Sequence, residues 1–240
     1  MRNLILIYAK PHIDGVSKTR LSKDLNIEDS MRLSKSLLEK NINLVKNSNF
    51  NFLLSTSKEE YVDILEKKYG VKTILQRGYD LGSKMYYSIY DGLKHYDSVT
   101  IMGADVVDFE KNMLLELESK IKSYDMVVSN TLDGGYSLIS LKEAYKTLFI
   151  GKTFSHNKVF TELIDSANKI NLETYILKRT MDIDDINSLA SYIGGIRTKK
   201  IYEDEKLIHF SNGSKTFVFY KKESKGSYID KICNVKYDII

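Results

Sequence analysis

The sequence has few residues that could form disulfides or bind transition metals. It contains one cysteine, Cys233, which permits neither a disulfide framework nor a cluster of zinc-binding thiolates. Its four histidines are scattered without the spacing of metal ligands. No apolar run approaches the roughly 20 residues of a membrane-spanning helix, and the run that begins at Leu4 is too short for a signal peptide. We therefore expect a cytoplasmic protein without a membrane span.

The sequence also lacks a strong charge imbalance. Its formal net charge is +4, and its basic residues form no long stripe interleaved with aromatic residues. This mild excess of positive charge suits an anionic small molecule, and no signature of RNA or DNA binding is present. We therefore expect small-molecule ligands and no nucleic acid.

Short apolar runs alternate with amphipathic helices along most of the chain. The first run, LILIYA at 4–9, is rich in Ile and Leu and bounded by charge and proline, as expected of a buried strand. A helix follows, with an apolar stripe made by Leu33, Leu37, Leu38, Ile42 and Val45. Further strands are expected at 50–55, 71–76, 97–105, 125–130, 136–141 and 173–178, and further helices near 58–68, 82–93, 110–121, 155–170 and 182–193. This alternation predicts an α/β fold with a doubly wound, mostly parallel sheet.

The pattern changes after Gly194-Gly195. Beyond this point the apolar residues alternate with period two on both sides of Asn212-Gly213, the strongest hairpin signal in the chain. We expect a core domain at 1–195 and a β-hairpin or small meander at 196–240. An exposed hairpin edge would allow homodimerisation through strand pairing.

Polar stretches stand where the predicted strands end. They are PHIDGVSKTR (11–20), QRGYDLG (76–82), GADVVDF (103–109), NTLDGGYSL (130–138) and MDIDDI (181–186). The carboxyl ends of parallel strands meet at one edge of the sheet, where ligands of open α/β folds bind. Cations in the first stretch and carboxylates in the third and fifth predict a nucleoside phosphate held by Lys and Arg together with a divalent metal.

Each of these residues also has a purely structural interpretation. Lys18 and Arg20 could belong to a solvated basic loop, and Asp105 could be a helix N-cap or strand-end residue. Asp182 and Asp184 could serve the N-terminus of the following helix. The glycine-rich stretch at 133–136 could be a tight turn between strands.

Five motifs in order resemble those of the DUF2064-type glycosyltransferases, a family with the GT-A (nucleotide-diphospho-sugar transferase-like) fold. More distantly, the chain is similar to 2-phospho-L-lactate and molybdopterin cofactor guanylyltransferases. The resemblance covers about residues 3–193. The matching residues are Pro11, Gly15, Lys18, Thr19, Arg20 and Leu21; Gln76, Gly78, Asp80, Leu81 and Gly82; Asp105; Asp133 to Tyr136; and Asp182 and Asp184. One departure is that Val106-Val107 stands where the family has Ser-Pro.

The resemblance implies roles for residues at these positions. The implied metal ligands are Asp105 and either Asp184 or Asp182, with Mg²⁺ as the natural ion and Mn²⁺ as an alternative. The acceptor pocket would be lined by Gly134, Gly135 and Tyr136. The candidate catalytic residues are Lys18, Arg20 and Asp133. The candidate nucleotide-binding residues are Ala9, Gly15, Lys18, Thr19, Arg20, Gln76, Asp80 and Gly82.

Two reactions fit these residues. In nucleotidyl transfer, a phosphorylated or acidic small-molecule acceptor attacks the α-phosphate of a nucleoside triphosphate and pyrophosphate leaves; the basic loop favours this reaction. In glycosyl transfer, a nucleotide-sugar donates its sugar to the acceptor; the family's customary name favours this alternative. A third hypothesis is a non-catalytic nucleotide-binding module, which the missing Ser-Pro after Asp105 leaves open.

Overall fold

The computed structural model describes residues 1–12, 18, 20–21, 27–185, 188–189, 192, 202–204, 207–212 and 215–220. The chain divides into two compact units. The first contains Met1–Pro11 and Lys40–Met181, and the second contains His12–Glu39 and Asp182–Ile240. None of the helices in the described ranges combines the length and apolar character that crossing a membrane requires.

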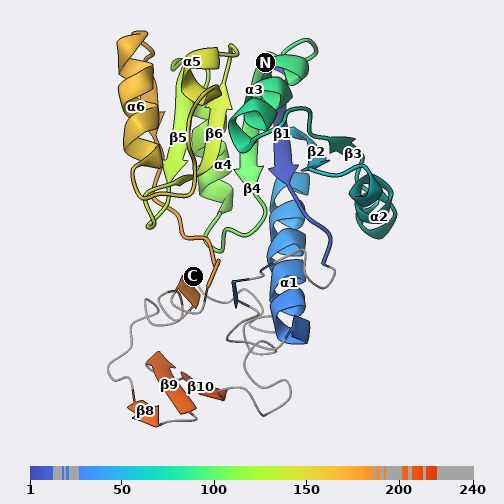
Figure 1. The fold of residues 1–240 in the computed structure, drawn as a ribbon, viewed down its shortest axis with the longest axis vertical. Coiled ribbons are helices and arrows are strands. Elements are labelled where there is room, and N and C mark those ends of the chain that lie inside the picture. Colours follow the sequence, from blue (N-terminus) through green and yellow to red (C-terminus); the bar gives the residue numbers. More distant parts are fainter. Residues whose placement is uncertain are drawn as a thin grey trace. The chain divides into compact units, whose positions relative to one another are not determined.

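The first unit is built on a seven-stranded sheet with the order β3-β2-β1-β4-β6-β5-β7 (Figure 1). The strands β1 to β4 pair in parallel, as do β5 and β7, whereas β6 runs antiparallel to both of its neighbours. The strands are β1 (Asn3–Tyr8), β2 (Asn51–Thr56), β3 (Thr73–Leu75), β4 (Ser98–Gly103), β5 (Met126–Asn130), β6 (Tyr136–Leu141) and β7 (Thr174–Ile176). The predicted mostly parallel α/β sheet is therefore confirmed.

Helices flank this sheet. One face is covered by α3 (Leu81–Gly92), α5 (Lys146–Phe149) and α6 (Val159–Lys169), whose apolar residues join those of β1, β4, β5 and β6 in one buried cluster. Alternate residues of a strand point to opposite faces, so Met102 and Val127, both fully buried, face the other side. Figure 1 shows α4 (Lys111–Lys120) on that side, and α2 (Glu60–Tyr69) beside the β2–β3 edge. Both faces of the sheet thus carry buried apolar residues, and the ends of its strands are the positions left for ligand binding.

The long helix α1 (Ile27–Lys46) carries the predicted apolar stripe. All five stripe residues are buried, as the period of the sequence indicates: Leu33, Leu37, Leu38, Ile42 and Val45. The division between the units falls within this helix, so that Lys40 and the residues after it belong to the first unit.

The second unit contains a three-stranded antiparallel sheet with the order β10-β9-β8. Its strands are β8 (Tyr202–Asp204), β9 (Leu207–Asn212) and β10 (Lys215–Tyr220), and Asn212 pairs with Lys215. The domain boundary at 195 stays a prediction.

Candidate functional site

The strand order creates a topological switch point between β1 and β4, at the carboxyl ends of the strands. From β1 the chain continues to β2 on one side, and it later returns to β4 on the other side. In open α/β sheets, ligands bind outside the carboxyl ends of the strands where the order reverses in this way. Ala9 follows β1, Gln76 follows β3 and Asp105 follows β4 closely. Three of the predicted site residues therefore stand at this edge.

Ala9 and Gln76, both predicted to bind nucleotide, meet on one carbonyl group. Ser55 O accepts hydrogen bonds from Ala9 N at 2.9 Å and from Gln76 Nε2 at 3.2 Å. Gln76 N also donates to Thr56 O at 2.7 Å. These bonds tie together the ends of β1, β2 and β3, so the Gln76 side chain has a defined position at the switch-point edge.

The loop after Gln76 ends in a helix cap. Asp80 Oδ1 accepts from Ser83 N at 2.6 Å, and Asp80 N donates to Ser83 Oγ at 3.0 Å, which forms a capping box at the start of α3. The hydrogen bond from the Ser83 backbone lowers the pKa of Asp80. A methyl group on Gly82 would lie 2.2 Å from Phe149 O, so this glycine is needed for close packing of α3 on α5. The structure thus gives Asp80 and Gly82 definite structural roles, and their contact with nucleotide stays a prediction.

Asp105 lies on a loop that is held at several points. Asn41 Nδ2 donates to Ala104 O at 3.0 Å and to Val106 O at 3.1 Å, so the side chain of Asn41 bridges the residues on either side of Asp105. Lys40 Nζ donates to Val107 O. Val106 and Val107 are buried, 1% and 3% exposed, so the two valines that replace the family's Ser-Pro anchor the loop in the core.

A second connection fixes the end of this loop. Val107 N donates to Met181 O at 3.0 Å, and Met181 N donates to Asp108 Oδ1 at 2.9 Å. Burial raises the pKa of Asp108, although the hydrogen bond from Met181 opposes this shift. Burial likewise lowers the pKa of Lys40, and the charges of Asp108 and Glu110 oppose that shift. The loop carrying Asp105 is therefore connected to both α1 and the segment that ends at Met181.

Sequence reasoning missed Lys40 and Asn41. The signal for Asn41 is its position, because it stands four residues after Leu37 and four before Val45 on the apolar stripe of α1. A polar residue at such a position, 0% exposed here, needs an internal hydrogen-bond partner. The sequence gives no comparable signal for Lys40.

The Asp133–Tyr136 stretch forms a compact turn between β5 and β6. Asp133 Oδ1 accepts from Gly135 N at 3.0 Å and from Thr131 Oγ1. Gly134 has φ +88°, and a methyl group on it would lie 2.1 Å from Asn157 O. Tyr136 Oη donates to Met85 Sδ at 3.6 Å, and burial raises the pKa of this tyrosine. These contacts show a turn of defined geometry; the catalytic and acceptor-binding roles predicted for its residues remain predictions.

In the second unit, two predicted phosphate-binding residues contact a predicted metal ligand. Lys18 Nζ lies 3.4 Å from Asp184 Oδ1 and also donates to Ile183 O. Arg20 Nη1 lies 3.7 Å from Asp184 Oδ2. The side chain of Lys18 is 4% exposed, whereas those of Arg20 and Asp184 are 67% and 50% exposed. Asp182 belongs to the same unit, while Gly15 and Thr19 lie outside the described residues.

The described residues fit a metal ion that takes few protein ligands. Among them, no three His, Cys, Asp or Glu side chains gather closely enough to hold a metal by themselves. A structural zinc site requires about four such ligands, whereas Mg²⁺ binds through one or two carboxylates, waters and substrate phosphates. Asp105 is half-buried on a loop held by hydrogen bonds, and its carboxylate is a hard oxygen donor of the kind that Mg²⁺ prefers.

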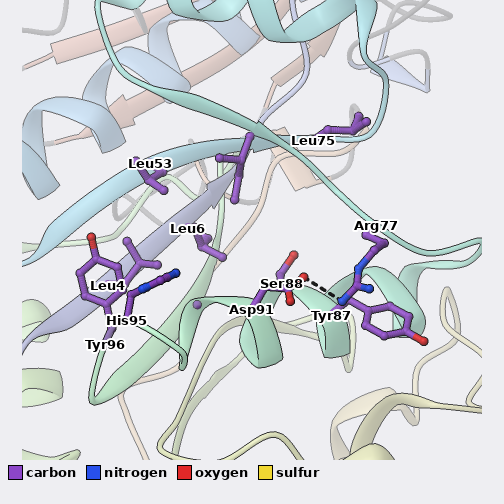
Figure 2. Close-up of a pocket in the computed structure, with 12 residues that line it drawn as sticks. Leu4, Leu6, Leu53, Leu75, Arg77, Tyr87, Ser88, Asp91, His95 and Tyr96 are labelled. Carbon is purple, nitrogen blue, oxygen red and sulfur yellow. Dashed lines mark hydrogen bonds and ion pairs between the residues drawn. The ribbon is translucent and has the colours of Figure 1, made fainter.

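A hollow of about 250 Å³ lies between α3 and strands β1 to β3 (Figure 2). Leucines such as Leu6 and Leu53 line it, and Arg77 at its rim forms a 2.9 Å ion pair with Asp91. None of the predicted site residues lines this hollow. We therefore place the candidate site at the carboxyl ends of the strands, where the backbone contacts and Asp105 lie.

Comparisons with solved structures show the fold. A Desulfovibrio desulfuricans G20 protein, provisionally assigned as a nucleotide-diphospho-sugar transferase, matches with a TM-score of 0.76 and 20% identity, over 83% of this chain and 90% of that chain. The inositol-1-phosphate CTP transferase from T. maritima matches with a TM-score of 0.53 and 13% identity, over 80% and 93%. A cytidylyltransferase from Leptospira borgpetersenii serovar Hardjo-bovis matches with a TM-score of 0.53 and 16% identity, over 80% and 85%. The fold is thus that of the nucleotide-diphospho-sugar transferase-like α/β proteins.

Sequence comparison gives a more limited match. A search of curated proteins finds no match. The family model DUF2064, described as "Uncharacterized protein conserved in bacteria", matches residues 42–156. This range contains the motifs around Gln76, Asp105 and Asp133. The resemblance to the DUF2064 family that these motifs indicate is therefore confirmed over the middle of the chain.

Proposed function

We propose that the protein is a transferase that uses a nucleotide substrate together with a divalent metal. The observation that carries this proposal is the switch-point edge of the sheet, where Ala9 and Gln76 share the Ser55 carbonyl and Asp105 follows β4. The folds most similar in the comparisons include proteins whose names specify nucleotide-diphospho-sugar or CTP transfer. Position in the fold and the chemistry of the residues thus support the same class of substrate.

Different residues would bind the nucleoside, the metal and the phosphates. The ends of β1 to β3 would hold the nucleoside, and Asp105 would hold Mg²⁺, with Mn²⁺ as an alternative. The metal, when bound, would neutralise phosphate charge and polarise the reacting phosphoryl oxygen. We retain phosphate contact as the proposed role of Lys18 and Arg20, because Arg can bind phosphate oxygens bidentately and Lys supplies a point charge. Asp184 or Asp182 stays the proposed second metal ligand.

We propose nucleotidyl transfer as the reaction. An acceptor oxygen would form a bond to the α-phosphorus of a nucleoside triphosphate, and the bond from that phosphorus to the bridging oxygen would break, releasing pyrophosphate. The leaving pyrophosphate takes up negative charge, which the cations of the basic loop would neutralise. The acceptor would be a small phosphorylated or acidic molecule bound near the Asp133–Tyr136 turn.

Glycosyl transfer from a nucleotide-sugar is the second candidate. The observation that favours it is the high structural similarity, with a TM-score of 0.76, to a protein provisionally assigned as a nucleotide-diphospho-sugar transferase. In this reaction the anomeric carbon of the sugar would bond to the acceptor and a nucleoside diphosphate would leave. The leaving group then differs, which makes the two candidates separable by product analysis.

A thermal-shift screen tests the proposed function. The ligands are ATP, GTP, CTP, UTP, UDP-glucose and GDP-mannose, each with Mg²⁺ and with EDTA. A ligand present at 100 times its Kd stabilises the folded state by about 2.7 kcal/mol, so we expect at least one to raise the Tm only when Mg²⁺ is present. Asp105→Asn should abolish this metal-dependent shift. Asp97→Asn is the control, because Asp97 immediately precedes β4 at the opposite edge of the sheet. If no ligand stabilises the parent, or if Asp105→Asn responds as the parent does, the proposal is wrong.

A further inference from the structure

We propose that Asn41 and Lys40 of α1 are positioning residues that hold the Asp105 carboxylate in place for the metal–nucleotide complex. This inference rests on the proposed function of Asp105. Neither residue needs to touch substrate, because both act on the backbone of the loop that carries Asp105.

The geometry of Asn41 defines what it can do. Its amide nitrogen lies within hydrogen-bond distance of two carbonyl oxygens, Ala104 O and Val106 O. An amide NH₂ carries two donors, so a single side chain satisfies both carbonyls. The opposite orientation would bring three oxygen atoms together, so the amide has one favourable orientation. The two pinned peptide groups flank Asp105 and restrict its backbone on both sides.

The two ends of the Asn41 amide contribute to stability in opposite directions. Asn41 is fully buried, and its Oδ1 has no hydrogen-bond partner among the residues that the structure describes. A buried acceptor without a partner destabilises the folded state. Leucine would continue the α1 stripe without this penalty, but it would leave the carbonyls of Ala104 and Val106 without their donor. The presence of asparagine is therefore explained by the loop that its NH₂ group holds.

Lys40 contributes an independent constraint two residues beyond Asp105. Lys40 Nζ donates to Val107 O, and the backbone N–H of Val107 donates to Met181 O at 3.0 Å. Val107 is thus fixed on both its N–H and its C=O. The position of a metal ligand must be held within a fraction of an ångström. Removing a residue that orients a metal ligand therefore typically weakens metal binding by about 10- to 100-fold.

The test compares nucleotide binding with and without metal. The probe is whichever of ATP, GTP, CTP and UTP stabilises the parent most, and its Kd is measured by calorimetry in Mg²⁺ and in EDTA. The ratio of the two Kd values gives the contribution of the metal. We expect Asn41→Leu to reduce this ratio about tenfold while leaving the Kd in EDTA close to the parent's. A general loss of stability would change both Kd values together and leave the ratio unchanged.

Asn3→Leu is the matched control. Asn3 is also buried, 6% exposed, and its Oδ1 accepts from Ser98 Oγ at 2.8 Å at the start of β1 and β4, the edge opposite Asp105. This variant should keep the parent's ratio. Hydrogen exchange gives a second readout without metal, in which the Val107 amide should exchange faster in Asn41→Leu than in Asn3→Leu.

Lys40 provides a pair of variants that remain informative if Asn41→Leu does not fold. Lys40→Met removes the donor but keeps most of the length of the side chain, and Lys40→Arg keeps a donor. We expect Lys40→Met to reduce the ratio and Lys40→Arg to restore most of it. An unchanged ratio in both Asn41→Leu and Lys40→Met, or an equal reduction in Asn3→Leu, overturns the inference. Failure of the proposed function can be distinguished from failure of this inference. In the first case the parent would bind no metal–nucleotide complex, or Asp105→Asn would bind it as well as the parent does. Either result would overturn the inference too, because it rests on the role of Asp105.

Discussion

Lys18 and Asp184 are 166 positions apart in the sequence, yet Lys18 Nζ lies 3.4 Å from Asp184 Oδ1. The first was predicted to contact phosphate and the second to bind metal. Their contact shows that a carboxylate and a nearly buried ammonium neutralise each other within the second unit. If Lys18 contacts phosphate as proposed, a bound phosphate would compete with Asp184 for it.

We first predict a measurable coupling between these two residues. The side chain of Lys18 is 4% exposed but that of Asp184 is 50% exposed, so solvent screens the pair in part. A double-mutant cycle with Lys18→Met and Asp184→Asn, measured by urea unfolding, should give a coupling free energy of about 1 kcal/mol. Lys58 and Glu60 form the control, because their atoms are also 3.4 Å apart but both side chains are exposed; their coupling should be smaller. Additive effects of the Lys18 and Asp184 variants would show that the contact contributes nothing.

The second prediction concerns the cap of α3. The pKa of Asp80 is lowered in the folded protein, chiefly by the hydrogen bond from Ser83 N. Its carboxylate therefore stabilises the fold fully above the unfolded pKa of about 3.9, and this contribution is lost as the pH falls through the lower folded pKa. Asp80→Ala should unfold at lower urea concentration than the parent at pH 7, and the difference should narrow at pH 3.

Asp80→Ser is the control for this prediction. Serine is also a favourable N-cap, and it does not titrate in this range, so the variant should keep most of the stability at both pH values. A gap between parent and Asp80→Ala that stays constant from pH 7 to pH 3 would contradict the role of the ionised carboxylate.

Third, we predict that Gly134 tolerates no side chain. Gly134 and Gly151 both have positive φ, +88° and +73°, but only Gly134 faces a neighbouring backbone, with Asn157 O 2.1 Å from the position of a methyl group. Gly151→Ala should cost about 1 kcal/mol for the left-handed conformation. Gly134→Ala adds a clash with backbone atoms that cannot move aside, and should cost about 3 kcal/mol in total. Equal midpoints of urea unfolding for the two variants would show that the turn relaxes around the added methyl group.

The main features of the fold could be predicted from local patterns. The stripe on α1 and the short apolar runs follow directly from helical and strand periodicity, which the sequence displays. The antiparallel direction of β6 does not follow from periodicity; it is set by the short turn through Asp133 and Gly134, which cannot span a parallel crossover. The short helix α5 has too few residues for a periodic signal.

The candidate site was predictable only where it follows strand ends. Ala9, Gln76 and Asp105 could be located because parallel strands bring their carboxyl ends to one edge. The bonds of Asn41 to Ala104 and Val106 could not, because they join a helix to a loop 63 and 65 positions away through side-chain geometry that no local pattern records. The same is true of the contact between Lys18 and Asp184.

The last prediction separates nucleotidyl from glycosyl transfer through Arg20. Its side chain is 67% exposed and its Nη1 lies 3.7 Å from Asp184 Oδ2, so Arg20→Ala should fold as the parent does. If the leaving group is pyrophosphate, Arg20 would face charge that develops in the transition state. Removing such a contact typically lowers kcat by about 100- to 1000-fold, with a much smaller effect on KM. If the donor is a nucleotide-sugar whose diphosphate is neutralised mainly by the metal, the variant should instead raise KM and preserve kcat.

Steady-state kinetics with parallel detection of pyrophosphate and nucleoside diphosphate decide between these outcomes. Lys18→Ala serves as a second variant, and Arg2→Ala is the control for loss of one positive charge, because Arg2 is exposed at the other end of β1. We expect pyrophosphate as the product, a large fall in kcat for Arg20→Ala and Lys18→Ala, and parental kinetics for Arg2→Ala. Release of nucleoside diphosphate with kcat preserved in both basic-loop variants would overturn nucleotidyl transfer and establish the glycosyl alternative. The physical reason is that only a charge that grows during the reaction makes a fixed cation contribute more to the transition state than to the bound substrate.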